Sequence, residues 1–372
     1  MGMHIEQSLR GVSVSSIQAT PTGFEYDRHF MLWDVNKSEN LHIGLRPALC
    51  LFSTKLLPEG KPDTIEVDFS LDHVFDRPDK PISQATLAVP LFPKVEGLEE
   101  RTVTMHLSPT PAYDMGEKYN SWFSDRLGYP VKLLYIGDYR RKVLGNMGDG
   151  VASSSVPMTN VVGMSIPITL AVALVTHKTF YHGAVQSAPL ITSVALLLAG
   201  CVFLLQRLGL GLPGKSPMIT FADLAAYLVI SKTSYEDVNG RLPDDEEMDI
   251  SKFRANIVVS GAEKPWEEDF WAEMVHGEDT LIKLTQNCAR CASLNVDYAT
   301  GKPGVSEAGK VLKKLSRDRR VDPGTKWSPI FGKYGFIMPR SGAADGVVMR
   351  VGDPVRVTKR NTARTVTDYP KS

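Results

Sequence analysis

Two cysteines separated by two residues, Cys288-Ala-Arg-Cys291, are the most informative local feature of the sequence. A structural zinc site needs four ligands, usually from two such pairs, and His276 is the only histidine near this one in sequence. A thioredoxin-type pair should open a helix after a strand, whereas the residues after Cys291 alternate as in a strand. Two interpretations remain: structural cysteines in a hairpin turn, or one thiolate that binds a soft metal, with its pKa lowered by Arg290.

Two arginine motifs suggest an anion site. Phe253-Arg-Ala-Asn256 precedes a predicted strand at 257–260, and Tyr26-Asp-Arg28 precedes an apolar run at 30–35. A planar guanidinium at the entry of a strand can pair with a phosphate, and the amide of Asn256 offers both a donor and an acceptor. Each motif alone is a weak signal, because most surface arginines are simply solvated.

Composition limits the classes of protein to consider. The 372 residues are 43% hydrophobic and 23% charged, enough for a buried core and long enough to favour two domains. The 42 basic and 42 acidic residues balance, which argues against a general nucleic-acid partner. Four cysteines in so long a chain do not form a disulfide scaffold, so we expect a reducing compartment.

The elements that must position these side chains are mostly strands. Residues 1–112 show short alternating or apolar runs separated by prolines, and 113–127 form a helical pattern that Gly128 ends. A predicted strand follows at 131–136. The other strands that we expect cover 30–35, 48–53, 64–69, 257–260, 280–285 and 294–298, with the cysteine pair between the last two.

Residues 151–206 differ from the rest of the chain. No charged residue occurs from 151 to 176, and a second uncharged run covers 188–206. About 20 apolar residues are needed to cross a bilayer, and two spans would form a hairpin that returns the chain to the same side. The alternatives are a buried or interfacial helical pair, a disordered insert or a mispredicted exon. If the hairpin exists, membrane contact runs through residues 161–206.

Six short motifs, taken in order, resemble the signatures of MOSC proteins, and more closely those of the mitochondrial amidoxime-reducing component group. The resemblance covers residues 5–140 and 219–358. As an ordered set the motifs are specific, although each alone is not. They are Gln7-Ser-Leu-Arg-Gly-Val, Tyr26-Asp-Arg-His-Phe-Met-Leu, Phe253-Arg-Ala-Asn-Ile-Val-Val-Ser-Gly, Glu268-Asp-Phe-Trp, Cys288-Ala-Arg-Cys and Phe331-Gly-Lys-Tyr.

The resemblance implies a mostly β fold with some α: a MOSC N-terminal β-barrel domain over 1–140 and a MOSC β-barrel domain over 219–358. We expect the apolar helical insert to occupy 141–218 and a loose C-terminal tail to occupy 359–372. A molybdenum-pterin cofactor (Mo-molybdopterin) would lie in the cleft between the two domains.

The resemblance also implies roles for individual residues. Cys291 would be the protein ligand to molybdenum and tune its potential, and the other matched residues would hold the pterin and its phosphate. Gln7 stands where the group usually has lysine, and Ala255 stands where proline is usual. The matched cofactor-binding residues are Ser8, Arg28, Arg254, Asn256 and Arg290.

We therefore expect a molybdenum-dependent oxidoreductase that reduces N-hydroxylated compounds such as amidoximes and hydroxylamines. No glycine fingerprint for a nucleotide follows a strand, and no four-cysteine iron–sulfur spacing exists, so electrons must come from outside. By resemblance the donors would be cytochrome b5 and its NADH-dependent reductase. No general acid stands out in the sequence. Asp297 lies near Cys291 in sequence, but an exposed hairpin carboxylate is the better explanation of it.

The resemblance places such a protein on the mitochondrial outer membrane, facing the cytosol; the alternative is a cytoplasmic protein. We see no cleavable targeting peptide in the first residues. Two other functions stay open. MOSC modules also occur in molybdenum-cofactor sulfurase, so the chain could be a carrier of cofactor or sulfur. The insert and the missing lysine would instead fit an inactive, membrane-associated scaffold.

Overall fold

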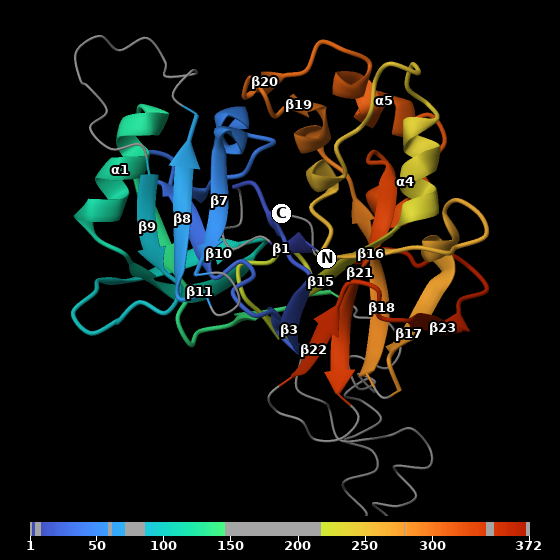
Figure 1. The fold of residues 1–372 in the computed structure, drawn as a ribbon, viewed down its shortest axis with the longest axis horizontal. Helices are drawn as coiled ribbons and strands as arrows, with labels where there is room; N and C mark the ends of the chain where they lie inside the picture. Colours follow the sequence, from blue (N-terminus) through green and yellow to red (C-terminus); the bar gives the residue numbers. More distant parts are fainter. Residues whose placement is uncertain are drawn as a thin grey trace, which may run out of the picture. The chain divides into compact units, whose positions relative to one another are not determined.

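The computed structural model describes residues 2–3, 9–58, 62–70, 86–145, 217–278, 280–339 and 346–369. Within these ranges the chain is built mainly from β-strands, with a few short helices between them (Figure 1). The mostly β class with some α is therefore confirmed. The α-helices in this part of the chain are α1 (Glu117–Leu127), α4 (Lys232–Asn239) and α5 (Val311–Leu315).

Two antiparallel sheets form the N-terminal region. One has the strand order β10-β11-β12-β5-β6 and the other β7-β8-β9. In β8 buried and partly exposed side chains alternate, which is the period of a strand with one face on a core. The bounds are β5 (Phe30–Asp34), β6 (Glu39–Asn40), β7 (Phe52–Leu57), β8 (Thr64–Phe69), β9 (Thr86–Pro90), β10 (Glu100–Met105), β11 (Ser108–Asp114) and β12 (Val131–Tyr135).

The helix expected at 113–127 is confirmed but begins later, at Glu117. Strand β11 continues to Asp114, whose Oδ1 accepts hydrogen bonds from the Gly116 amide (2.9 Å) and from Asn120 Nδ2 (2.7 Å). At the other end Gly128 has φ 82° and its amide bonds to the Ser124 carbonyl, so the left-handed residue ends the helix where expected.

A six-stranded sheet with the order β16-β15-β21-β18-β17-β23 forms the C-terminal region (Figure 1). Every residue of β15 is buried, as expected for a strand with neighbours on both edges and both faces covered. The bounds are β15 (Tyr227–Ser231), β16 (Ile257–Val259), β17 (Trp271–His276), β18 (Thr280–Ala289), β21 (Ile330–Pro339) and β23 (Val355–Arg360).

Small sheets connect distant parts of the chain. Strand β3, near the N-terminus, pairs with β22, near the C-terminus, so the two regions share a sheet. Strands β13 and β14 pair with Arg141 opposite Ile219, which places the two ends of the undescribed stretch side by side. The bounds are β1 (Gly2–Met3), β2 (Val12–Ser13), β3 (Ser16–Thr20), β4 (Gly23–Phe24), β13 (Arg141–Lys142), β14 (Met218–Ile219), β19 (Val296–Asp297), β20 (Lys302–Pro303) and β22 (Val347–Arg350).

The predicted insert lies largely outside the described residues. Strands β13 and β14 show that the folded chain extends a few residues into both ends of the range 141–218. The apolar runs, and with them the membrane hairpin and contact through 161–206, fall where the structure is not described. Among the residues that are described, no helix combines the length and apolar character that a membrane span requires.

Three local predictions are wrong. The run at 48–53 begins as a 3₁₀ helix (Pro47–Leu51), because a proline at the first helical position favours that turn. The run at 294–298 is a 3₁₀ helix (Ala292–Asn295) followed by the two-residue β19. The tail over 359–372 is not loose as far as residue 369, because β23 extends to Arg360 and hydrogen bonds to buried side chains fix the residues after it.

Glu268 is a fully buried carboxylate in a 3₁₀ helix (Glu267–Phe270) that precedes β17. Its Oε2 accepts a hydrogen bond from Ser234 Oγ (2.7 Å), and its Oε1 has no partner among the described residues. Burial raises the pKa of Glu268 from 4.5 to about 7, and the neighbouring Asp269 adds to this. Between pH 4.5 and about 7, the folded protein therefore keeps a proton on Glu268 that the unfolded chain has lost.

We expect Glu268→Gln to stabilise the protein at pH 8 and to change little near pH 4.5. As the pH rises from 4.5 to about 7, the unfolded chain loses this proton before the folded protein does. The free energy of unfolding therefore falls through that window, because the buried carboxylate must ionise. At 1.36 kcal/mol per pKa unit, the gain at pH 8 is at most about 3 kcal/mol. Urea unfolding at both pH values measures it, with Glu267→Gln as the neighbouring control. An equal effect at both pH values would contradict the assignment.

Candidate functional site

The cysteine pair lies where β18 leaves the six-stranded sheet. A break in the register with β21 between Asn287 and Ala289 falls at Cys288 itself, and such bulges re-aim side chains. Cys288 is buried, whereas Cys291 is exposed in extended backbone just before the 3₁₀ helix Ala292–Asn295. The two thiols therefore have different surroundings, and Cys291 is the accessible one.

Arg290 contacts the buried cysteine rather than the exposed one. Its Nη1 donates to Cys288 Sγ (3.0 Å) and its Nη2 to the Phe253 carbonyl (2.6 Å). Although burial alone would lower it, the neighbouring sulfur of Cys288 raises the pKa of Arg290. The Sγ of Cys291 lies 3.2 Å from Ser293 Oγ. The arginine is thus fixed beneath the pair and stays charged.

Arg28 and Asn256 belong to one buried network. Arg28 Nη1 donates to Asp27 Oδ2 (2.5 Å) and to Asn256 Oδ1 (3.4 Å), and Asn256 Nδ2 donates to Asp27 Oδ2 (3.1 Å). Asn256 Oδ1 also accepts from the Leu228 amide (3.0 Å). Burial would lower the pKa of Arg28, but the carboxylate of Asp27 raises it. Because its amide is engaged in these bonds, Asn256 positions Arg28.

Two of these arginines have a left-handed backbone. The φ angles are 54° at Arg28 and 55° at Arg254, and residues other than glycine adopt this region at a cost of about 1–3 kcal/mol. Arg254 follows the 3₁₀ helix Ile250–Phe253, and its Nη1 donates to the Leu9 carbonyl (2.8 Å). Surrounding contacts hold both residues in this conformation, which is common at functional sites.

These side chains meet at one small cavity of about 80 Å³. All the predicted site residues line it except Ser8, which lies outside the described residues. The structure thus brings together residues that the sequence separates by more than 250 positions. The lining is Arg28, Asp223, Ala225, Leu228, Phe253, Arg254, Asn256, Cys288, Ala289, Arg290, Cys291, Ser293 and Tyr334.

A second cavity, of about 510 Å³, adjoins the first. The two share part of their lining, so they meet beside the Cys291 thiol. The shared residues are Asp223, Arg254, Ala289, Cys291, Ser293 and Tyr334. The larger cavity is also lined by Asn40, His42, Ile43, Gly44, His106, Leu224, Asn287, Gly324, Thr325, Thr367 and Tyr369.

Sequence reasoning missed the polar residues of the larger cavity. Asp223 is 43% exposed, and its Oδ1 lies 3.4 Å from His106 Nε2. Partial desolvation in the cavity would raise the pKa of Asp223, but the hydrogen bond with His106 and the charges of Arg28 and Arg254 lower it. Nothing in the local sequence marks either residue. Tyr334, by contrast, ends the Phe331-Gly-Lys-Tyr motif, which was a usable signal.

Asp297, which we expected to be a hairpin carboxylate, lines neither cavity. Its oxygens accept hydrogen bonds from the Ala299 amide (2.9 Å) and from Thr300 Oγ1 (2.9 Å). The bond from Ala299 is the main reason why its pKa is lowered. This carboxylate therefore stabilises the turn after β19.

The donor set of the smaller cavity fits a molybdenum-pterin cofactor. The phosphate of that group is anionic and pairs with guanidinium groups, and its molybdenum takes soft sulfur ligands such as a thiolate. The cavity is lined by three guanidinium groups and by the exposed thiol of Cys291. Arg28 Nε is buried and makes no hydrogen bond within the described part of the chain, so it is a donor without a protein partner.

Comparisons with known proteins identify two family domains in the chain. The family model of the MOSC N-terminal beta barrel domain matches residues 6–130, and that of the MOSC domain matches 217–356. Together the two models cover more than half of the chain. Neither match covers the apolar residues 151–206.

Curated relatives match over shorter stretches. Mitochondrial amidoxime-reducing component 1 is 34% identical in Homo sapiens and 36% in Mus musculus, in each case over 37% of this chain and 38% of the relative. Molybdenum cofactor sulfurase of Arabidopsis thaliana is 33% identical over 28% of this chain and 13% of the relative. The chain thus aligns with less than two-fifths of the length of these relatives.

Proposed function

Since this chain belongs to the MOSC family, with a MOSC N-terminal β-barrel domain ahead of its MOSC domain, we propose that it is a molybdenum-cofactor oxidoreductase. Its substrates in this proposal are small N-hydroxylated compounds such as amidoximes and hydroxylamines. The similarity to amidoxime-reducing components supports the reaction, and the similarity to molybdenum cofactor sulfurase supports the cofactor.

The observation that carries the proposal is the position of the Cys291 thiol. It is exposed at the junction of a small cationic cavity and a larger cavity that can admit a substrate. A metal held there by the thiolate would face both. The bound cofactor would supply the two-electron chemistry that removes the substrate's hydroxyl oxygen as water.

The residues of the smaller cavity act by binding and by orientation. The guanidinium groups of Arg28, Arg254 and Arg290 would pair with the phosphate and the dithiolene of the pterin. Asn256 and Asp27 hold Arg28 in its strained backbone conformation. Ser8, which the structure does not describe, is proposed as a further contact by resemblance.

The residues of the larger cavity act on the substrate. Because its pKa is lowered, Asp223 is ionised at neutral pH and can accept hydrogen bonds from the N–H groups of an amidoxime. Reduction of the N–O bond consumes protons, and His106 Nε2, next to Asp223, is one atom that can carry a proton to the substrate.

Electrons would come from cytochrome b5 and its NADH-dependent reductase. The reduction needs two electrons, and the sequence has neither an iron–sulfur spacing nor a nucleotide fingerprint. The mitochondrial names of the relatives support a mitochondrial location, and the outer membrane, facing the cytosol, is proposed by resemblance.

The similarity to molybdenum cofactor sulfurase favours a second candidate function, a carrier of the cofactor or of sulfur. A carrier would bind the cofactor with the same arginines but would not turn over an N-hydroxylated substrate. If cofactor-loaded protein reduces many amidoxime molecules per protein molecule, the carrier function is excluded. If cofactor-loaded protein shows no amidoxime turnover, the carrier function is favoured.

The proposal is tested by expressing the full chain in a host that makes the cofactor and measuring molybdenum, pterin and amidoxime reduction. We expect near-stoichiometric molybdenum in the wild-type protein. In an Arg254→Met variant the dissociation constant of the cofactor should rise about 10–100-fold, since hydrogen bonds to charged groups contribute about 1.5–3 kcal/mol. Arg241→Met, which removes an exposed pairing with Asp318, is the matched control. Folded wild-type protein without molybdenum would overturn the proposal.

A further inference from the structure

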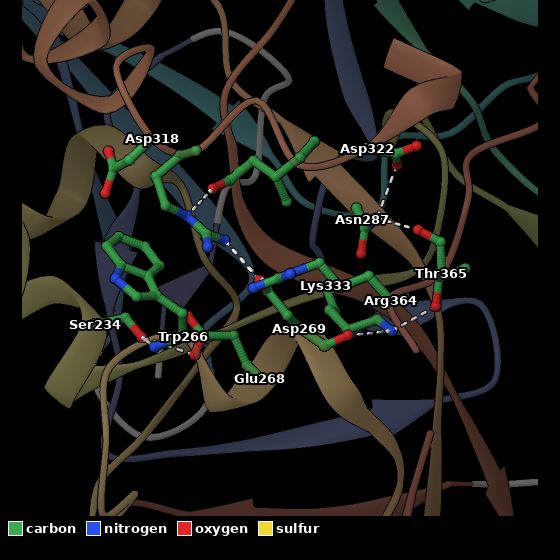
Figure 2. Close-up of polar contacts among 12 residues, drawn as sticks. Ser234, Trp266, Glu268, Asp269, Asn287, Asp318, Asp322, Lys333, Arg364 and Thr365 are labelled. Carbon is green, nitrogen blue, oxygen red and sulfur yellow. Dashed lines mark hydrogen bonds and ion pairs between the residues drawn. The ribbon is translucent and has the colours of Figure 1, made fainter. Parts of the chain in front are cut away.

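Residues 361–369, which follow β23, form a fixed strap, here called the C-terminal strap. Arg364 Nε donates to the buried Asp269 Oδ2 (2.7 Å), and Lys333 Nζ donates to Thr365 Oγ1 (2.8 Å), as Figure 2 shows. Asn287 Nδ2 donates to the Thr365 carbonyl (2.6 Å). Lys333 and Asp269 are almost completely buried, so the strap is tied to the interior of the C-terminal sheet.

A second anchor lies further along the strap. The buried Asp322 carboxylate accepts hydrogen bonds from the Thr367 amide (3.1 and 3.2 Å) and from Thr367 Oγ1 (2.7 Å). Gly324 packs directly beneath this point, and a Cβ there would overlap the carbonyl oxygen of Thr367. The strap therefore occupies a position that leaves no room for a larger residue at 324.

The end of the strap reaches the N-terminal sheets. The Tyr369 hydroxyl donates to the carbonyl oxygen of His106, in the turn between β10 and β11. The two rings meet edge to face, with centroids 6.4 Å apart. Thr367, Tyr369, His106 and Cys291 all line the larger cavity. One aromatic side chain thus connects the two regions at the cavity that the exposed Cys291 lines.

We propose that the C-terminal strap is one wall of the substrate cavity and that Tyr369 is a specificity-determining residue that limits the size of molecules reaching Cys291. The inference rests on the proposed function only for the identity of the substrate, because the wall and the thiol are features of the chain itself. Since the anchors of the strap are buried and charged, the wall does not yield to a bulky ligand. Removing the ring of Tyr369 should widen the cavity beside Cys291.

Thiol alkylation of cofactor-free full-length protein tests this without any turnover. The rate at Cys291 is followed by mass spectrometry of its peptide, with iodoacetamide as the small reagent and N-(1-pyrenyl)maleimide as the bulky one, each normalised to glutathione. We expect Tyr369→Ala to raise the bulky rate about tenfold or more and to change the small rate by about twofold at most. Tyr369→Phe keeps the ring and should stay close to wild type.

A second variant displaces the strap without touching its side chains. Gly324→Ala should lift Thr367 and raise the bulky rate in the same direction. Gly240→Ala is the matched control, since a Cβ there meets only ordinary contacts at 3.6 Å. If folded Tyr369→Ala and Gly324→Ala both keep the wild-type bulky rate, the inference is wrong.

Turnover separates this inference from the proposed function. In loaded protein, Tyr369→Ala should raise kcat/KM for a bulky amidoxime about tenfold relative to a small one. An unchanged ratio would contradict the role of Tyr369 in specificity. If wild-type protein instead binds no molybdenum and shows no turnover, yet gives the expected alkylation rates, the proposed function is overturned. The strap would then remain one wall of a cavity with a different function.

Discussion

Replacing Cys291 by alanine is expected to leave the purified protein without stoichiometric molybdenum and to lower amidoxime reduction about 100-fold or more. Loss of a partner that only supports a metal ligand already costs about 10–100-fold in metal affinity or activity, so loss of the ligand itself should cost at least as much. The fold should survive, because Cys291 is exposed and its removal creates no buried cavity.

Molybdenum per protein by plasma mass spectrometry, pterin by fluorescence and amidoxime reduction with a chemical reductant measure the effect. A chemical reductant removes any dependence on a protein donor. Ser293→Ala is the graded comparison, because its hydroxyl lies 3.2 Å from the sulfur and it should lower the molybdenum content less than loss of the thiol does. A Cys291→Ala variant with wild-type molybdenum content would show that another group holds the metal.

The smaller cavity could be located from the sequence because short contiguous motifs carry it. In Phe253-Arg-Ala-Asn256 the arginine and the asparagine flank one turn at the start of a strand, so their neighbourhood is decided locally. Cys288-Ala-Arg-Cys291 likewise follows from the end of one strand. Resemblance to a family then connected these motifs to Arg28, which no local rule could do.

The larger cavity could not be located in this way. Asp223, His106 and Tyr369 come from three distant parts of the chain. Buried Arg141 donates to the carbonyls of Met105 (2.9 Å) and Asp223 (2.5 Å). The strap brings Tyr369 to His106. Their neighbours in sequence give no signal for a site. Tertiary arrangement decides their role.

The C-terminal strap shows why composition alone misled us. Polar residues at a chain end usually remain solvated and loose. Here Thr365 and Thr367 are partners of Lys333 and Asp322, which are buried and need hydrogen bonds from somewhere. The strap is ordered because the buried Lys333 and Asp322 need hydrogen-bond partners. The sequence of the strap itself does not reveal that need.

Replacing Asp269 by alanine is expected to lower the free energy of unfolding by about 3–5 kcal/mol. Asp269 accepts from Arg319 Nη2 (2.7 and 2.9 Å) and from Arg364 Nε (2.7 Å). Arg319 is 3% exposed, so it cannot turn to water when its carboxylate is removed. The cost arises from the buried charge that is left without a partner.

Urea unfolding followed by circular dichroism measures the loss. Glu267→Ala is the matched control from the same 3₁₀ helix (Glu267–Phe270), since it breaks a pairing of 2.8 Å with Arg360, whose side chain is 51% exposed. Such exposed pairs contribute about 0–1 kcal/mol, so the control should differ little from wild type. An equal loss of unfolding free energy in Asp269→Ala and Glu267→Ala would mean that burial does not decide how much an ion pair contributes.

The double variant Asp269→Ala/Arg319→Met separates charge from packing. If the unpaired guanidinium causes the loss, removing it as well should restore a large part of the stability, because a buried ion pair and an apolar pair of similar volume are often about equally stable. The stem of methionine can keep part of the contact that Arg319 makes with the Trp266 ring, 4.0 Å from the guanidinium carbon. A double variant no more stable than Asp269→Ala would instead assign the loss to the detached strap and to the packing that Asp269 supports.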